Sequence, residues 1–117
     1  MGVTDVAFTM YPVTDVHRAR KFYEEALGLR QCGMDEAWWV EFGIGSATFG
    51  IGNVPDNGKP GSAQSLVLEV SDINGYRESL RKRGIASTEP TRTPFDCLVS
   101  QLKDPDGNTV WLHEKLQ

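Results

Sequence analysis

Hydrophobic and polar residues alternate in the sequence TVWLHE near the C-terminus, and this alternation predicts a β-strand with two different faces. Val110 and Leu112 fall on one face, and Trp111 and His113 fall on the other. The turn-forming sequence DPDGN precedes the strand. Because the aliphatic face is expected to pack in the core, we expect Trp111 and His113 on the face that the core does not use.

Apolar residues recur at helical spacing in two other segments, each of which follows an aspartate and stops at a glycine. The first segment lies between Asp15 and Gly28, and the second lies between Asp72 and Gly84. Aspartate favours a helix start because its carboxylate accepts from the free amides of the first turn, and glycine favours a helix end because it adopts the left-handed conformation. The sequences VTDV and VSDI at the two starts indicate an internal repeat.

Strand patterns surround both predicted helices. The first half has one strand leading into Asp15 and three more at 29–33, 37–42 and 47–52. The second half has four, at 66–70, 85–87, 97–103 and 109–114. The order is βαβββ twice, which predicts an α+β fold in which two βαβββ modules turn facing curved mixed sheets toward a cleft.

The length of 117 residues fits a single domain in which the two modules share one core. The N-terminal module is expected to span residues 1–53, and the C-terminal module is expected to span residues 64–117. A linker rich in Gly and Pro joins them at residues 54–63. The sequence allows the modules to pair within one chain or between two chains.

Three pieces of the chain, VTDVHRARKFYEEALGL, VSDINGYRESLRKRGI and LKDPDGNTVWLHE, together resemble the vicinal oxygen chelate superfamily. This superfamily includes glyoxalase I, the bleomycin resistance proteins and the extradiol dioxygenases, and the resemblance implies a homodimer. Its metal-dependent members carry His or Glu at four places on the bare faces of the sheets. By motif position, this sequence has Phe8, Gly50, Ser65 and Trp111 at those places. None is a usual metal ligand, so no cofactor is predicted, and a divalent metal would need a displaced site.

Aromatic residues at these places favour a stacking site over a chelating site. Neighbouring strand residues point to opposite faces, so of the adjacent Trp38 and Trp39 one is expected to pack on the helix and the other, Trp39, to face the cleft opposite Gly50. The predicted ligand is a planar or apolar small molecule. The residues expected to bind it are Phe8, Met10, Trp39, Gly50, Ser65, Trp111 and His113.

Glu41, Glu69 and His113 are weak candidates for a catalytic role, because strand alternation places all three on the cleft side. Three functions stay open. The first is a metal-free protein that binds a small molecule, as the bleomycin resistance proteins do. The second is an enzyme of lyase, isomerase or dioxygenase type that uses these residues as a general base or as displaced metal ligands. The third is a protein-interaction module.

Charge and composition exclude some partners. The net charge of −4 and the scattered Lys and Arg argue against nucleic acid, and no apolar run approaches the ~20 residues that cross a bilayer. The N-terminus lacks the basic and apolar regions of a signal peptide, so we expect a cytoplasmic protein. Cys32 and Cys97 lack CxxC spacing and are expected to be reduced, partly buried thiols.

Overall fold

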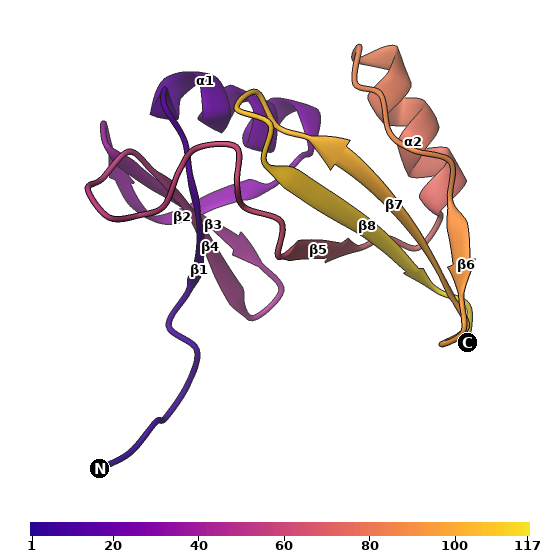
Figure 1. Cartoon of the computed structure of the whole chain (residues 1–117), viewed down its shortest axis with the longest axis horizontal. Helices are drawn as coiled ribbons and strands as arrows, with labels where there is room; N and C mark the ends of the chain where they lie inside the picture. Colours follow the sequence, from indigo (N-terminus) through magenta and orange to yellow (C-terminus); the bar gives the residue numbers. More distant parts are fainter.

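A computed structural model describes residues 1–117 and contains two four-stranded sheets, each accompanied by helical structure (Figure 1). The N-terminal module consists of β1 (Thr9–Pro12), α1 (Val16–Lys21), the π-helix η1 (Phe22–Ala26), β2 (Arg30–Glu36), β3 (Trp39–Ile44) and β4 (Ala47–Gly52). The C-terminal module consists of β5 (Leu66–Glu69), α2 (Ile73–Lys82), β6 (Thr91–Thr93), β7 (Cys97–Lys103) and β8 (Thr109–Lys115). The predicted βαβββ repeat is therefore confirmed.

Both sheets have the same mixed topology. The strand orders are β1-β4-β3-β2 and β5-β8-β7-β6, with β1 parallel to β4, β5 parallel to β8, and the other pairs antiparallel. In Figure 1 the helices lie on the upper side of the two sheets, and the N-terminal residues before β1 extend away from the body. No helix of the structure has the length and apolar character needed to span a membrane.

The first helix starts as predicted but does not stay α-helical. The Asp15 carboxylate accepts from the Arg18 amide at 3.1 Å, which is the N-cap bond that the sequence indicates. Beyond Lys21 the backbone widens into η1, where the Leu27 amide donates to the Phe22 carbonyl at 3.0 Å. Periodicity predicted one continuous helix because apolar residues recur every three or four positions through the segment, and this pattern does not mark the one extra residue of a π-helical turn.

The predicted strand at 85–87 is wrong. The edge strand of the second sheet is β6, which pairs with β7 further along the chain. The backbone at 85–87 is held by other means, because the Arg77 guanidinium donates to the Ser87 carbonyl at 3.2 Å and Ile85 packs against the core. The Ile85 amide also donates to the Leu80 carbonyl at 2.9 Å, so these backbone groups bond to the end of α2 and to a side chain rather than to a neighbouring strand.

The register of the β3–β4 hairpin also differs from the expectation. Ile44 pairs with Ala47, so the turn has two residues, and Trp39 lies opposite Gly52 rather than Gly50. Glu41 takes the place opposite Gly50. A shift of two residues preserves the face of every side chain, so the predicted cleft side of Trp39 and Glu41 is retained.

One core joins the two modules. Sixteen buried residues from both modules form a single cluster, which includes Val110 and Leu112 at 0% exposure, as the alternation in β8 predicts. Cys97 is buried, whereas Cys32 is exposed on β2, so the expectation of partial burial is wrong for both thiols. Cys32 lies on a strand whose residues are almost all exposed, and that strand is an edge of its sheet.

The DPDGN turn before β8 bridges the modules. The Tyr23 hydroxyl donates to Asp104 Oδ2 at 2.8 Å, and Asn108 Nδ2 donates to the Pro12 carbonyl at 2.9 Å. Thr14 Oγ1 donates to Asp106 Oδ1 at 2.6 Å. We call this set of contacts the DPDGN junction.

Candidate functional site

Trp39 forms the floor of a hollow on the bare face of the N-terminal sheet. Its indole lies across two glycines of β4, because a Cβ atom at Gly50 or at Gly52 would come closer than 3.0 Å to ring atoms. The sequence GIG at 50–52 therefore makes room for a ring that lies flat on the sheet. Trp39 is only 6% exposed, so its position is fixed by packing.

Glu41 holds the edge of this indole. Trp39 Nε1 donates to Glu41 Oε2 at 2.9 Å, and the Met34 amide donates to Glu41 Oε1 at 3.0 Å. The Met34 amide reaches the carboxylate because β2 is irregular between Gln31 and Asp35, where Gly33 adopts a φ of 92°. A Cβ atom at Gly33 would lie 2.5 Å from Glu41 Oε1, so this position also requires glycine.

Apolar side chains surround this floor and line an open depression of about 300 Å³, which we call the aromatic pocket. Phe8 stands edge-on to Trp39, with ring centroids 5.4 Å apart and an interplanar angle of 71°. The residues that line the pocket are Phe8, Met10, Met34, Trp38, Trp39, Glu41 and Val54. Phe8, Met10, Trp39 and Glu41 were predicted on the cleft side, whereas Met34 and Val54 were not, because they lie in an irregular strand and in the linker and carry no periodic signal.

Trp38 does not pack on a helix, and that expectation is wrong. It lies in the turn before β3, is 50% exposed and contributes to the rim of the aromatic pocket. Strand alternation begins only at Trp39, so it does not set the direction of Trp38.

The bare face of the C-terminal sheet carries the other predicted residues. His113 Nδ1 lies 2.6 Å from Glu69 Oε1, and the two residues are direct neighbours across β5 and β8. The Lys115 amide donates to Glu69 Oε2 at 2.8 Å, and this hydrogen bond, followed by the contact with His113, lowers the pKa of Glu69. Trp111 is half-buried, and its Nε1 donates to the Gln64 carbonyl at 3.1 Å.

These two sets of residues do not share the aromatic pocket. Its lining comes from the N-terminal module and from Val54, and it includes neither Trp111 nor His113 nor the exposed Ser65. Gly50 lies beneath Trp39 and takes part through the space it leaves for the ring. The binding roles of Ser65, Trp111 and His113 stay predictions.

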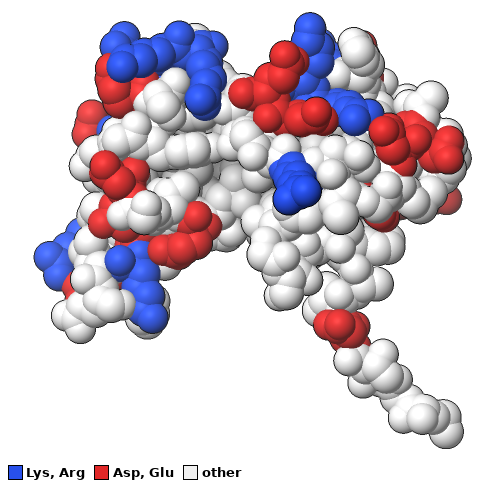
Figure 2. Space-filling view, turned by 180° about the vertical axis from the view of Figure 1, so that it is seen from behind, with Lys and Arg blue, Asp and Glu red and all other residues white.

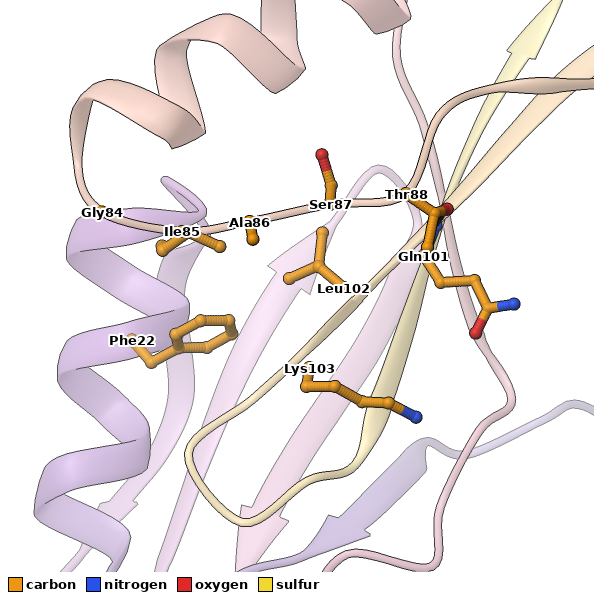
Figure 3. Close-up of a pocket in the computed structure, with 9 residues that line it drawn as sticks. All are labelled: Phe22, Gly84, Ile85, Ala86, Ser87, Thr88, Gln101, Leu102 and Lys103. Atoms are coloured by element: carbon orange, nitrogen blue, oxygen red, sulfur yellow. Dashed lines mark hydrogen bonds between the residues drawn. The ribbon is translucent and has the colours of Figure 1, made fainter.

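A second hollow of about 500 Å³ lies between η1, the segment after α2, and β7 (Figure 3). Figure 3 shows Phe22, Ile85 and Leu102 along its inner side, with Gln101 and Lys103 near one end. No sequence pattern predicts this hollow, because much of its lining comes from a π-helix and a loop without a recognisable motif. It holds no aromatic ring besides Phe22.

The residues at the four metal places do not fit a metal ion. Phe8 and Gly50 have no ligating side chain, and Ser65 and Trp111 do not provide the imidazole or carboxylate groups that such ions prefer. No group of three or more His, Cys, Asp or Glu side chains in residues 1–117 is placed to hold a metal. The His113–Glu69 pair supplies two such groups.

The surface charge is mixed. On the face shown in Figure 2, basic and acidic side chains lie beside one another at the top and at the lower left, and the surface between them is largely uncharged. This face lacks the continuous positive field that nucleic acid requires.

The fold and the pocket define a class of two-module α+β proteins with a concave apolar site of the kind that holds small molecules. The model of the Glyoxalase/Bleomycin resistance protein/Dioxygenase superfamily matches residues 6–112, and the chain belongs to this superfamily. No curated protein matches the chain in sequence.

Solved structures extend the comparison. TnmS3, an antibiotic binding protein from Streptomyces sp. CB03234, is 27% identical with a TM-score of 0.82, covering 98% of each chain. A glyoxalase/bleomycin resistance protein from the same Streptomyces is 26% identical with a TM-score of 0.77, covering 92% of this chain and 98% of that one. Lactoylglutathione lyase from Agrobacterium tumefaciens has a TM-score of 0.80 at 18% identity, covering 97% and 96%, and shares the fold.

Proposed function

We propose that this protein binds a planar or apolar small molecule in the aromatic pocket. The observation that carries the proposal is the set of large apolar side chains that stay exposed around the fixed Trp39 floor. Phe8 and Met10 are each 43% exposed, Met34 is 45% exposed, and Trp38 is 50% exposed. A ligand that covers these side chains removes apolar surface from water, which favours binding at about 25 cal/mol per Å² before the costs of association.

The comparison with TnmS3 supports the same proposal. That protein is an antibiotic binding protein, and it matches this chain over 98% of both lengths at 27% identity. A rigid indole floor with flexible methionines at the rim suits a ligand of planar shape, because thioether side chains adapt to irregular outlines.

We further propose that a homodimer completes the site. Trp111 and His113 lie on the bare face of the C-terminal sheet, Ser65 directly precedes β5, and all three lie outside the aromatic pocket of their own chain. Pairing of the N-terminal module with the C-terminal module of a second copy would bring them to the ligand. Light scattering at micromolar concentration should give twice the 13.0 kDa chain mass, and a particle of one chain mass would contradict the dimer.

The proposed site works without a resident metal, because the residues at the four metal places lack suitable donor groups. Elemental analysis of protein purified without added metal should find no stoichiometric zinc, nickel, iron or manganese. One equivalent of such a metal that is lost on mutating Glu69 or His113 would favour an enzyme with a displaced site.

Tryptophan fluorescence tests the binding site directly. Planar dyes should change the emission of Trp38 and Trp39, and Phe8→Ala or Met34→Ala should weaken their binding by about tenfold, since each substitution removes apolar contact area worth on the order of 1.4 kcal/mol. Phe95→Ala is the matched control, because Phe95 is 88% exposed and lies outside the pocket. Equal effects of all three substitutions would contradict the assignment of the pocket.

The His113–Glu69 pair favours a second candidate, an enzyme that moves a proton. The carboxylate 2.6 Å from Nδ1 orients the imidazole, an arrangement suited to a general base that acts through Nε2. Proton NMR in D2O can follow exchange of the α-protons of hydroxyacetone. Acceleration by the protein that is lost in His113→Gln would support this candidate, whereas an unchanged exchange rate would count against it.

A further inference from the structure

We propose that the aromatic pocket selects a cationic ligand, a quaternary or N-alkylated ammonium group carried on an apolar body. This inference rests on the proposed function, because it names the ligand class of the same pocket. The geometry behind it is a single carboxylate set among three aromatic rings.

The carboxylate belongs to Glu41. It is the one charged residue that lines the pocket. Both of its oxygens accept hydrogen bonds from neutral donors, the Trp39 indole and the Met34 amide, which orient the carboxylate but do not neutralise it. None of the ion pairs in residues 1–117 includes Glu41. Its negative charge therefore stays uncompensated at a partly buried position.

Several residues around Glu41 fix the position of its carboxylate. Gly33 and the irregularity of β2 bring the Met34 amide onto the carboxylate, and Gly50, which pairs with Glu41 across the sheet, leaves space for the Trp39 ring beside it. A neutral glutamine could also accept from the Trp39 indole, so a pocket that serves only apolar ligands does not need the negative charge, which costs hydration when it is partly buried.

The rings of Phe8, Trp38 and Trp39 line the same cavity. Aromatic faces attract cations through their quadrupole, and several rings around one site are the arrangement that recognises quaternary ammonium groups. Each Glu41 oxygen already accepts one N–H donor, so this carboxylate does not have enough free acceptor sites for all three N–H groups of a primary ammonium. An N-alkylated ammonium fits this condition better than a primary ammonium, which needs acceptors for three N–H groups.

The test compares two probes of nearly equal shape, phenyltrimethylammonium and tert-butylbenzene, by tryptophan fluorescence titration. The cation should bind about tenfold more tightly than the neutral probe, a difference of about 1.4 kcal/mol. Glu41→Gln keeps an acceptor for the indole and should bring the two affinities close together while leaving tert-butylbenzene binding intact. Glu36→Gln is the matched control, because Glu36 is exposed outside the pocket and the substitution changes the net charge equally.

A second variant covers the case in which Glu41→Gln does not fold. Phe8→Leu replaces an exposed ring by an aliphatic side chain and should lower the preference for the cation more than it lowers binding of the neutral probe. Equal affinity of both probes for the wild-type protein, or an unchanged preference in Glu41→Gln, would overturn the cationic ligand and leave the apolar site standing. Binding of neither probe would overturn both proposals.

Discussion

Substitution of Gly50 by alanine should displace the Trp39 indole from the sheet. A Cβ atom at Gly50 would come within 3.0 Å of three atoms of the ring, and these atoms belong to a rigid side chain that is 6% exposed. The ring cannot yield by a small rotation, because Phe8 packs on it and Glu41 holds its Nε1. We therefore expect the indole to move and the hydrogen bond to Glu41 to break.

The expected loss combines three effects. Overpacking costs about 1 to 3 kcal/mol, loss of a hydrogen bond to a carboxylate costs about 1.5 to 3 kcal/mol, and replacing glycine returns about 0.4 to 1 kcal/mol by restricting the unfolded chain. The net destabilisation should be about 1.5 to 5.5 kcal/mol, or a fall in Tm on the order of 10 °C for a domain of this size. Urea denaturation and thermal unfolding measure it, and the binding of planar dyes should weaken in parallel.

Gly43→Ala supplies the matched control. Gly43 lies in the neighbouring strand β3, and a Cβ atom there would meet only Cys32, at 3.4 Å or more. This substitution should be nearly neutral. A Gly50→Ala protein as stable as Gly43→Ala, with unchanged tryptophan emission, would show that Trp39 does not lie on the glycines and would refute the reasoning.

Three further outcomes follow from burial and from the pKa shifts. Val110→Asp should abolish folding because it buries a charge in the core, whereas Trp111→Ala should lower Tm by only a few degrees. If circular dichroism shows that Val110→Asp still folds, the assignment of the two faces of β8 is wrong. Burial, reinforced by the nearby Asp104, raises the pKa of Tyr23 above 10.0. The protonated hydroxyl therefore contributes its full stability below pH 10, and this contribution is lost as the pH rises above 10. Above pH 10, the Tm of Tyr23→Phe should fall less steeply with pH than the Tm of the wild-type protein. The lowered pKa of Glu69 contributes stability above pH 4.5 that is lost as pH falls further; Glu69→Gln should remove this small part of the acid dependence in pH titrations of Tm.

Local patterns were sufficient to predict most of the fold. Alternation in β8 placed Val110 and Leu112 in the core, and the Asp15 cap marked the start of the first helix. These signals are local because the side-chain direction in a strand and the free amides at a helix start depend on the immediate sequence. They carry over to the three-dimensional structure whenever one face of the element is buried.

The misassigned features depend on contacts across the sheet or across the chain. The register of the β3–β4 hairpin required the turn length, and the four residues 43–46 contain two glycines that allow either a two-residue or a longer turn. Residues 85–87 have the local propensity of a strand, but the Arg77 guanidinium, rather than a neighbouring strand, donates to the Ser87 carbonyl. A hydrogen bond from a long side chain to a separate segment leaves no periodic pattern in the sequence.

The candidate site was predicted in part for the same reason. Trp39 and Glu41 follow from strand faces and Phe8 from its position in the family motif, whereas Met34 reaches the pocket through the irregularity of β2, which depends on the positive φ of Gly33. A glycine inside a strand signals a bulge or a close approach, and Gly33 and Gly50 both carry that signal. The sequence shows the glycines but not the side chains that use the space.

The DPDGN junction has a consequence for how this chain can change over evolutionary time. Its two halves share the repeated sequences VTDV and VSDI, yet the Tyr23 hydroxyl donates to Asp104, and the Pro12 carbonyl accepts from Asn108. Either half alone would leave a tyrosine or an aspartate of the present interior without its partner. We therefore expect a change that removes one module to destabilise the other, so that the two modules are kept or lost together.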